Sequence, residues 1–160
     1  MAVSKGVDSF ASNAEADSIN SEHPFGSSWE SVSGDMQDAL LRWATRLLNT
    51  MIPWRVHPTD PDQPLVFPAR YLVSITGGYE DSDEIPTPIV YATVEYARRL
   101  GETGGSILNN QGVVDQDIRA LPGGLAFGGG ARRKPIPDAV LELIPQHWRG
   151  SVNSVQLRRV

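Results

Sequence analysis

With 160 residues, the chain has the length of a single domain. It has no cysteine, which excludes disulfides and thiolate metal sites, and its three histidines are too scattered to suggest a metal site. No apolar run approaches the ~20 residues of a membrane helix, and the N-terminus has no signal-peptide core, so we expect a cytoplasmic protein without membrane contact. The net charge of −5 disfavours non-specific attraction to nucleic acid.

The N-terminal region predicts a loose tail followed by a short helix. Residues 1–11 show no periodic pattern and are expected to be flexible. Ser12 and Glu15 have the spacing of a capping box, which predicts a helix over residues 13–21. That helix carries few apolar residues, so it must dock on the rest of the chain to be stable.

The strongest helical pattern begins after Ser33, a favourable N-cap, and continues to residue 51. Asp38 and Arg42 are four residues apart and are expected to pair on its exposed face. The spacing predicts a buried stripe that consists of Met36, Leu40, Trp43, Ala44, Leu47 and Met51, widened by Leu41 and Leu48.

Residues 54–84 are rich in proline and glycine and predict a long loop with one short strand over 71–75. A loop of this length in a small domain is usually functional or held by a neighbour. Near its end lies an acidic cluster of Glu80, Asp81, Asp83 and Glu84, of which Asp81, Asp83 and Glu84 are expected to be solvated.

A third helix is predicted from Thr87 to Leu100, with Gly101 as its C-terminal cap. One face should be buried and consists of Ile89, Val90, Thr93, Tyr96, Ala97 and Leu100. A fourth, short helix is expected over residues 137–145, with Val140, Leu143 and Ile144 in the core.

Together these elements predict a single mainly α domain over residues 1–160. We expect a small bundle of about four helices with long loops. A β-hairpin-like, glycine-rich arm over 112–134 should separate helices three and four, and residues 151–160 should form an extended C-terminal arm.

The glycine-rich stretch GGLAFGGGARRK, residues 123–134, raises the question of a phosphate-binding loop. A P-loop requires a lysine followed by a hydroxyl residue at the start of a helix. Here Lys134 is followed by Pro135, and Pro137 delays the next helix. The stretch is therefore interpreted as a flexible arm and not as a nucleotide site.

Catalytic motifs are also absent from the sequence, and we predict no enzyme activity, no cofactor and no metal. His57 is the one candidate general base, but no orienting partner is visible near it in the sequence. Trp54 and Trp148 follow prolines near helix ends, where each could be either a lid on the core or a contact residue.

The order of several motifs resembles the head–tail adaptor (connector) proteins of tailed bacteriophages, some of which are described as DnaT-like single-stranded DNA-binding proteins. The motifs are Ser12-x-x-Glu15-Ala16-Asp17, Trp29 before a helix, ALLRWATRLL at 39–48, Trp54-Arg55, TDPDQPLVFPAR at 59–70, and Ile85-Pro86 opening a helix. The resemblance is good over about residues 9–101 and moderate over 137–145. Members carry a hairpin between their third and fourth helices, where this chain has its glycine-rich residues 112–134.

The resemblance implies a structural virion protein at the head–tail interface, made in the host cytoplasm. Typically about twelve copies form a ring under the portal protein, extend the DNA channel and meet the next tail or neck protein. Duplex DNA would pass through without specific binding, which an acidic surface would favour.

Contacts with the portal, a neighbouring subunit or the tail are assigned to the two arms and to the residues before the second arm. These candidates are Val113, Val114, Ile118, Arg119, Phe127, Arg132, Arg133, Lys134, Trp148, Arg149, Val155, Leu157, Arg158 and Arg159. Val155 and Leu157 are expected to add a strand to a partner's sheet edge.

The main alternative is a single-stranded DNA-binding replication protein. The basic C-terminal third of the chain favours it, and the net charge of −5 opposes it. A small enzyme that uses His57 is a weaker third hypothesis.

Overall fold

The computed structural model describes residues 2–104 and 136–150. These ranges form α1 (Asn13–Ser21), α2 (Ser27–Glu30), α3 (Gly34–Met51), α4 (Thr87–Glu102) and α6 (Asp138–Glu142), followed by the 3₁₀ helix η2 (Gln146–Trp148). Strands β1 (His57–Pro58) and β2 (Ala69–Arg70) form one small antiparallel pair. The fold is therefore mainly α with long loops, as predicted; the predicted arms over 112–134 and 151–160 lie outside the described residues.

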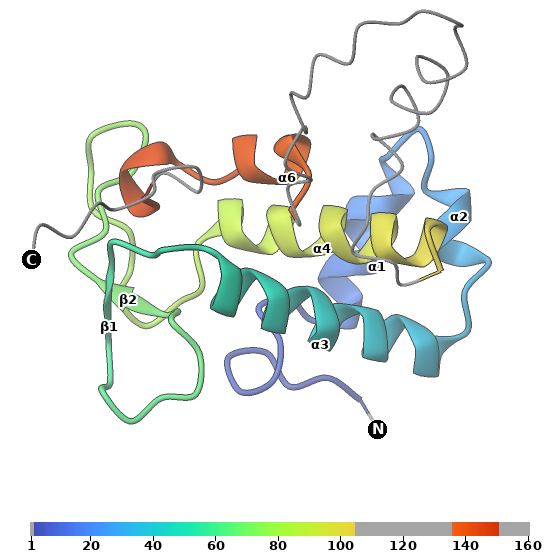
Figure 1. The fold of residues 1–160 in the computed structure, drawn as a ribbon, viewed down its shortest axis with the longest axis horizontal. Helices are drawn as coiled ribbons and strands as arrows, with labels where there is room; N and C mark the ends of the chain where they lie inside the picture. The colour runs from blue at the N-terminus through green and yellow to red at the C-terminus, as the bar shows by residue number, and fades with distance from the viewer. Residues whose placement is uncertain (1, 105–135, 151–160) are drawn as a thin grey trace, which may run out of the picture.

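Helices α3 and α4 run side by side and form the centre of the fold (Figure 1). All six residues predicted for the buried face of α4 are buried, which confirms that face. The two helices approach closely at Gly101, where an added Cβ would lie 3.1 Å from Leu40 Cδ1. Because α4 continues to Glu102, Gly101 lies within the helix, and the prediction that it ends α4 is wrong. Gly104, with a φ of +65°, adopts the left-handed conformation just beyond the helix end.

The buried stripe of α3 is centred on Leu41, Ala44 and Leu48, all fully buried. Met36 is 54% exposed, contrary to the prediction, and Trp43 is only partly buried against the core. At 100° per residue, Met36 points about 140° away from Leu41 around the helix axis. The sequence pattern located the stripe but placed its centre too far toward Met36 and Trp43.

The N-terminal segment is packed on α3, so the prediction of a loose tail over residues 1–11 is wrong for its described part. Phe10 is fully buried and its amide donates to Thr45 Oγ1 at 3.0 Å. Asp38 and Arg42, which were predicted to pair with each other on α3, instead bind residues near the N-terminus. Arg42 Nε donates to Asp8 Oδ2 at 2.8 Å, and Asp38 is buried and accepts a hydrogen bond from Asn13.

The capping box of α1 is confirmed. The Glu15 amide donates to Ser12 Oγ at 3.3 Å, and the Ser12 amide donates to Glu15 Oε2 at 2.9 Å. α1 covers the predicted range, and its docking residues Ala16 and Asn20 are buried. Its thin apolar content is thus compensated by tertiary contact.

The corner between α1 and α2 leaves no room for a side chain at residue 26. A Cβ on Gly26 would lie 1.8 Å from the backbone oxygen of Asn20, and backbone cannot move away as a side-chain tip can. We expect Gly26→Ala to lower the free energy of unfolding by about 3 kcal/mol, as severe overpacking does. Gly34→Ala is the matched control because nothing lies within 4 Å of its added Cβ. Urea unfolding of both variants measures the difference; equal stability would contradict this packing.

The predicted strand over residues 71–75 does not form. Strand β2 ends at Arg70, and Tyr71 has a φ of 58°, which turns the chain out of an extended path. The register of the small sheet pairs His57 with Arg70 and Pro58 with Ala69.

The C-terminal described segment packs on α4 through α6. Val140 and Ile144 are buried as predicted, but Leu143 is 39% exposed and Leu141 takes its place in the core. The helix ends at Glu142, earlier than expected, so residues 143–145 do not keep the helical spacing. No helix in the two described ranges is long and apolar enough to cross a membrane.

Candidate functional site

Most of the predicted contact residues fall in the two segments that the structure does not describe. Only Trp148 and Arg149 lie within the described residues. Trp148 is 2% exposed, and its Nε1 donates to the carbonyl of Val73 at 2.9 Å. Arg149 Nε donates to the carbonyl of Ile144 at 3.3 Å. Trp148 thus lies in the core rather than on a contact surface, and the roles of the twelve positions outside the described ranges stay predictions.

The described surface carries a concentration of exposed apolar side chains at one loop, which we call the 71–79 turn. Tyr71 and Tyr79 are each 78% exposed, Ile75 is 74% exposed and Val73 is 43% exposed. Large apolar side chains gathered this densely on a surface loop are typical of a contact site for another molecule.

The backbone of the 71–79 turn is held in place by hydrogen bonds. The Ser74 amide donates to the carbonyl of Gly78 at 2.7 Å, and the Glu80 amide donates to that of Leu72 at 2.9 Å. Leu72 itself is 2% exposed and fixes the base of the turn to the core. The turn presents its apolar side chains from a structured backbone.

Four carboxylates follow the turn directly, and we call them the acidic rim: Glu80, Asp81, Asp83 and Glu84. Asp81, Asp83 and Glu84 are exposed, which confirms that they are solvated. The Asp83 amide donates to Asp81 Oδ1 at 2.8 Å, and Thr59 Oγ1 donates to the carbonyl of Ser82 at 2.5 Å. The apolar turn therefore borders a fixed patch of negative charge.

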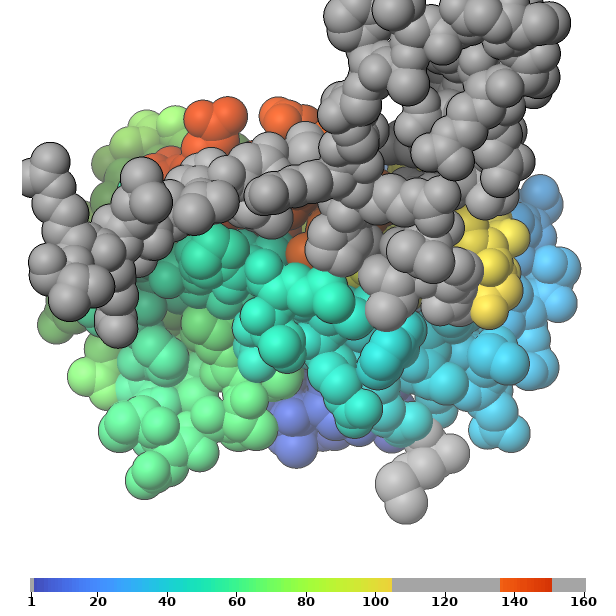
Figure 2. Space-filling model, viewed as in Figure 1, coloured from blue at the N-terminus to red at the C-terminus, as the bar shows by residue number. Residues whose placement is uncertain are grey.

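Charge is divided unequally along the chain. The described residues contain 17 acidic and 8 basic side chains, and the remaining ones contain 2 acidic and 6 basic. These counts give net charges of −9 and +4, which sum to the −5 of the whole chain. The described part is strongly acidic (its surface is drawn in colour in Figure 2), and the two arms carry the net positive charge.

The candidate general base His57 lies exposed on β1, where its backbone pairs with Arg70. Across residues 2–104 and 136–150, no group of three or more His, Cys, Asp or Glu side chains is arranged to hold a metal ion. Nothing in the described geometry around His57 adds to the enzyme hypothesis.

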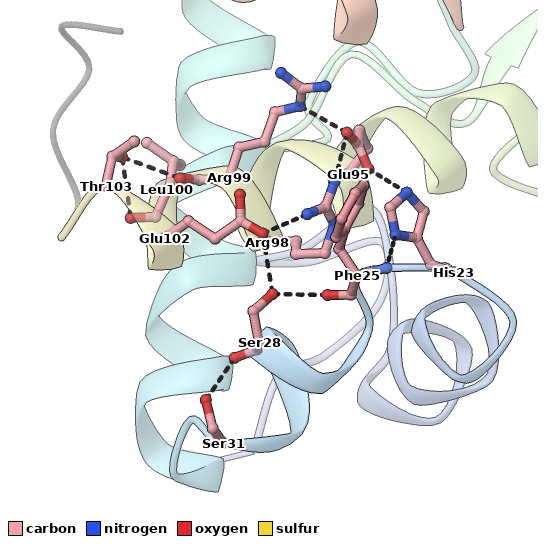
Figure 3. A network of polar contacts seen from close by, with 10 residues as sticks. All are labelled: His23, Phe25, Ser28, Ser31, Glu95, Arg98, Arg99, Leu100, Glu102 and Thr103. Carbon is pink, nitrogen blue, oxygen red and sulfur yellow. Dashed lines mark hydrogen bonds and ion pairs between the residues drawn. The ribbon is translucent and has the colours of Figure 1, made fainter. Parts of the chain in front are cut away.

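A network of ion pairs on α4 connects it to the segment before α2 (Figure 3). Arg98 is 5% exposed and reaches Glu95 at 2.8 Å and Glu102 at 2.5 Å. Glu95 also accepts from Arg99 at 2.6 Å and lies 3.7 Å from His23 Nε2. Ser28 donates to Glu102 at 3.0 Å, so the same charges hold the α2 region against α4. This network is structural, because its charges are used within the fold.

The network makes stability depend on pH. Burial raises the pKa of the Glu95 carboxyl. The hydrogen bonds and positive charges of Arg99 and Arg98 lower it by more, so the pKa of Glu95 lies below its ordinary value of 4.5. A carboxylate with a depressed folded-state pKa stabilises the fold above its unfolded pKa and loses that contribution as the pH falls. We expect the free energy of unfolding to decrease as the pH drops below about 4.5, and Glu95→Gln to flatten that dependence. Urea unfolding across this pH range measures both; an identical slope in the variant would contradict the assignment.

The fold and surface define a small, mainly helical protein that offers an exposed apolar turn on an acidic body. Its sequence matches the family described as "Putative DnaT-like ssDNA binding protein" over residues 2–157, and the chain belongs to that family. No curated protein and no solved structure matches it.

The family match confirms only the DnaT-like part of the resemblance found in the sequence. The comparisons name no head–tail adaptor. The sequence interpretation missed the 71–79 turn, although a signal was present: three large apolar residues, Tyr71, Ile75 and Tyr79, surround the turn-forming pair Gly77-Gly78.

Proposed function

We propose that this protein acts through protein–protein contact, as a ring-forming structural adaptor at the head–tail interface of a tailed phage. In this role it docks under the portal, extends the DNA channel and receives the next tail or neck protein. It performs no catalysis, is made in the host cytoplasm and functions in the virion. The observation that carries the proposal is the 71–79 turn with its acidic rim.

The chemistry of this surface suits a protein partner better than a nucleic acid. Exposed tyrosines and aliphatic side chains are the residues that fill the centre of protein interfaces. Tyrosine can also stack on bases, but single-stranded DNA binding combines stacking with a positively charged groove. The acidic rim places negative charge beside the tyrosines, where it repels phosphates. The order of motifs shared with head–tail adaptors supports the same conclusion.

The adaptor role is tested by co-sedimenting the purified protein with portal rings of the same phage and imaging the product by electron microscopy. We expect one added ring with a fixed number of copies per portal. Intact portal rings that remain bare in the presence of folded protein would refute the role.

Binding of single-stranded DNA is the second candidate, favoured by the description of the family to which the chain belongs. Its binding groups would be the basic residues of the two arms, since the described part has a net charge of −9. A salt titration with a fluorescent oligonucleotide tests it. Log affinity should fall with log salt by about 0.7 for each phosphate contacted. Tight, salt-dependent binding together with bare portal rings would select this function over the adaptor role.

A further inference from the structure

We propose that the 71–79 turn and its acidic rim receive residues 151–160 of a second copy of this chain. The inference rests on the proposed function, because it names the contact by which neighbouring copies would join. The acceptor is assigned from the geometry of the turn, and the occupant from its charge, its apolar spacing and the position where the described chain ends.

The acceptor is organised before any partner arrives. Trp148 Nε1 and His147 Nε2 both lie within hydrogen-bond distance of the carbonyl of Val73, at 2.9 and 2.8 Å. Trp148 holds the turn from the core and His147 from the surface, while Ile75 and Tyr79 remain exposed. A preorganised surface loses little conformational entropy on binding, so its apolar side chains contribute more to affinity.

The occupant complements this surface in both charge and apolar content. In SVNSVQLRRV, residues 151–160, Val155 and Leu157 are two positions apart, a spacing that would put both on one face of the segment if it binds as an extended strand. Arg158 and Arg159 follow directly and are opposite in charge to the four carboxylates of the acidic rim. The segment thus carries apolar side chains followed by positive charge, and the acceptor carries apolar side chains followed by negative charge.

The direction of the described chain favours a second copy over the same one. The Arg55 amide donates to the carbonyl of Trp148 at 2.9 Å, and the Gly150 amide donates to that of Pro53 at 2.6 Å. Residues 148–150 therefore run antiparallel to 53–55, so at Gly150 the chain heads toward the end of α3. The ten residues beyond Gly150 span up to about 35 Å when extended, which is enough to reach a neighbour.

The absence of cysteine from the natural sequence allows a direct test by disulfide trapping. Full-length Ile75→Cys and full-length Val155→Cys are prepared separately, mixed under mild oxidation with and without portal rings, and analysed on non-reducing gels. We expect the mixed dimer to exceed, by about tenfold, that formed with Met36→Cys, a matched exposed apolar position on α3. Adding Arg158→Glu and Arg159→Glu to Val155→Cys should lower the yield about threefold or more at low salt.

Each outcome decides the inference separately from the proposed function. Equal trapping by Ile75→Cys and Met36→Cys overturns the docking contact, and the proposed function stands if rings still form on the portal. A chain carrying both Ile75→Cys and Val155→Cys that yields only an internal disulfide also overturns it, because the tail then folds onto its own turn. A protein that stays monomeric in analytical ultracentrifugation with and without portal rings overturns both.

Discussion

Replacing Phe67 with alanine is expected to lower the free energy of unfolding by about 3 to 5 kcal/mol, the range for a fully buried phenylalanine. Phe67 is 0% exposed, and its ring lies 5.0 Å from that of Trp54, 5.8 Å from that of Phe10 and 6.3 Å from that of Trp148. It joins the N-terminal segment, the end of α3 and the C-terminal described segment. No single neighbour can refill the volume it leaves, so a cavity should remain.

Urea unfolding followed by tryptophan fluorescence measures this loss, because two of the rings that contact Phe67 are indoles. Domains of this kind are stable by about 5 to 15 kcal/mol, so the variant should be close to unfolding. Phe25→Ala is the matched control, since Phe25 is 67% exposed, and it should change stability by less than about 0.5 kcal/mol. Similar stability losses in the two variants would contradict the proposed core.

Arg98→Met is expected to lower the free energy of unfolding by about 2 to 3 kcal/mol. Removing one partner of a buried ion pair costs about 3 to 5 kcal/mol when the other charge is left unpaired. Here Arg99 remains beside Glu95, and Glu102 has a side chain that is 37% exposed, so the loss should be smaller.

A double-mutant cycle isolates this interaction. Glu95→Gln combined with Arg98→Met should be less destabilised than the sum of the single variants, with a coupling energy of about 1 to 2 kcal/mol. Arg99→Met is the control on the same helix face, because Arg99 has a side chain that is 31% exposed, and it should cost less than about 1 kcal/mol. Additive effects of the substitutions at 95 and 98 would show that the buried pair contributes nothing of its own.

The long helices were predictable because their apolar residues repeat with helical spacing and each begins with a recognisable signal. α1 and α3 match the predicted ranges, and α4 begins at the expected Thr87. The errors have physical causes in tertiary contact. The buried Phe10 and the ion pair between Asp8 and Arg42 fix a segment whose composition predicts a tail. The closeness of α3 and α4 makes Gly101 a packing position rather than a helix end.

The candidate site was harder to predict than the fold. The sequence directed attention to glycine, arginine and lysine in the arms, because charge clusters are visible without a structure. The 71–79 turn was not recognised, because apolar residues in a loop are as compatible with burial as with exposure. Leu72 shows the difficulty: it is 2% exposed, while its neighbours Tyr71 and Val73 are 78% and 43% exposed. Only the tertiary structure separates these cases.

The measurement that tests the central claim most directly is co-sedimentation of the wild type and an Ile75→Asp, Tyr79→Ser double variant with portal rings of the same phage. Both substituted residues are exposed, so the variant should keep its fold, which circular dichroism and urea unfolding verify. The account predicts a stoichiometric ring for the wild type and loss of that ring for the folded double variant. Bare portal rings with the wild type, or equal retention of the double variant, would contradict it.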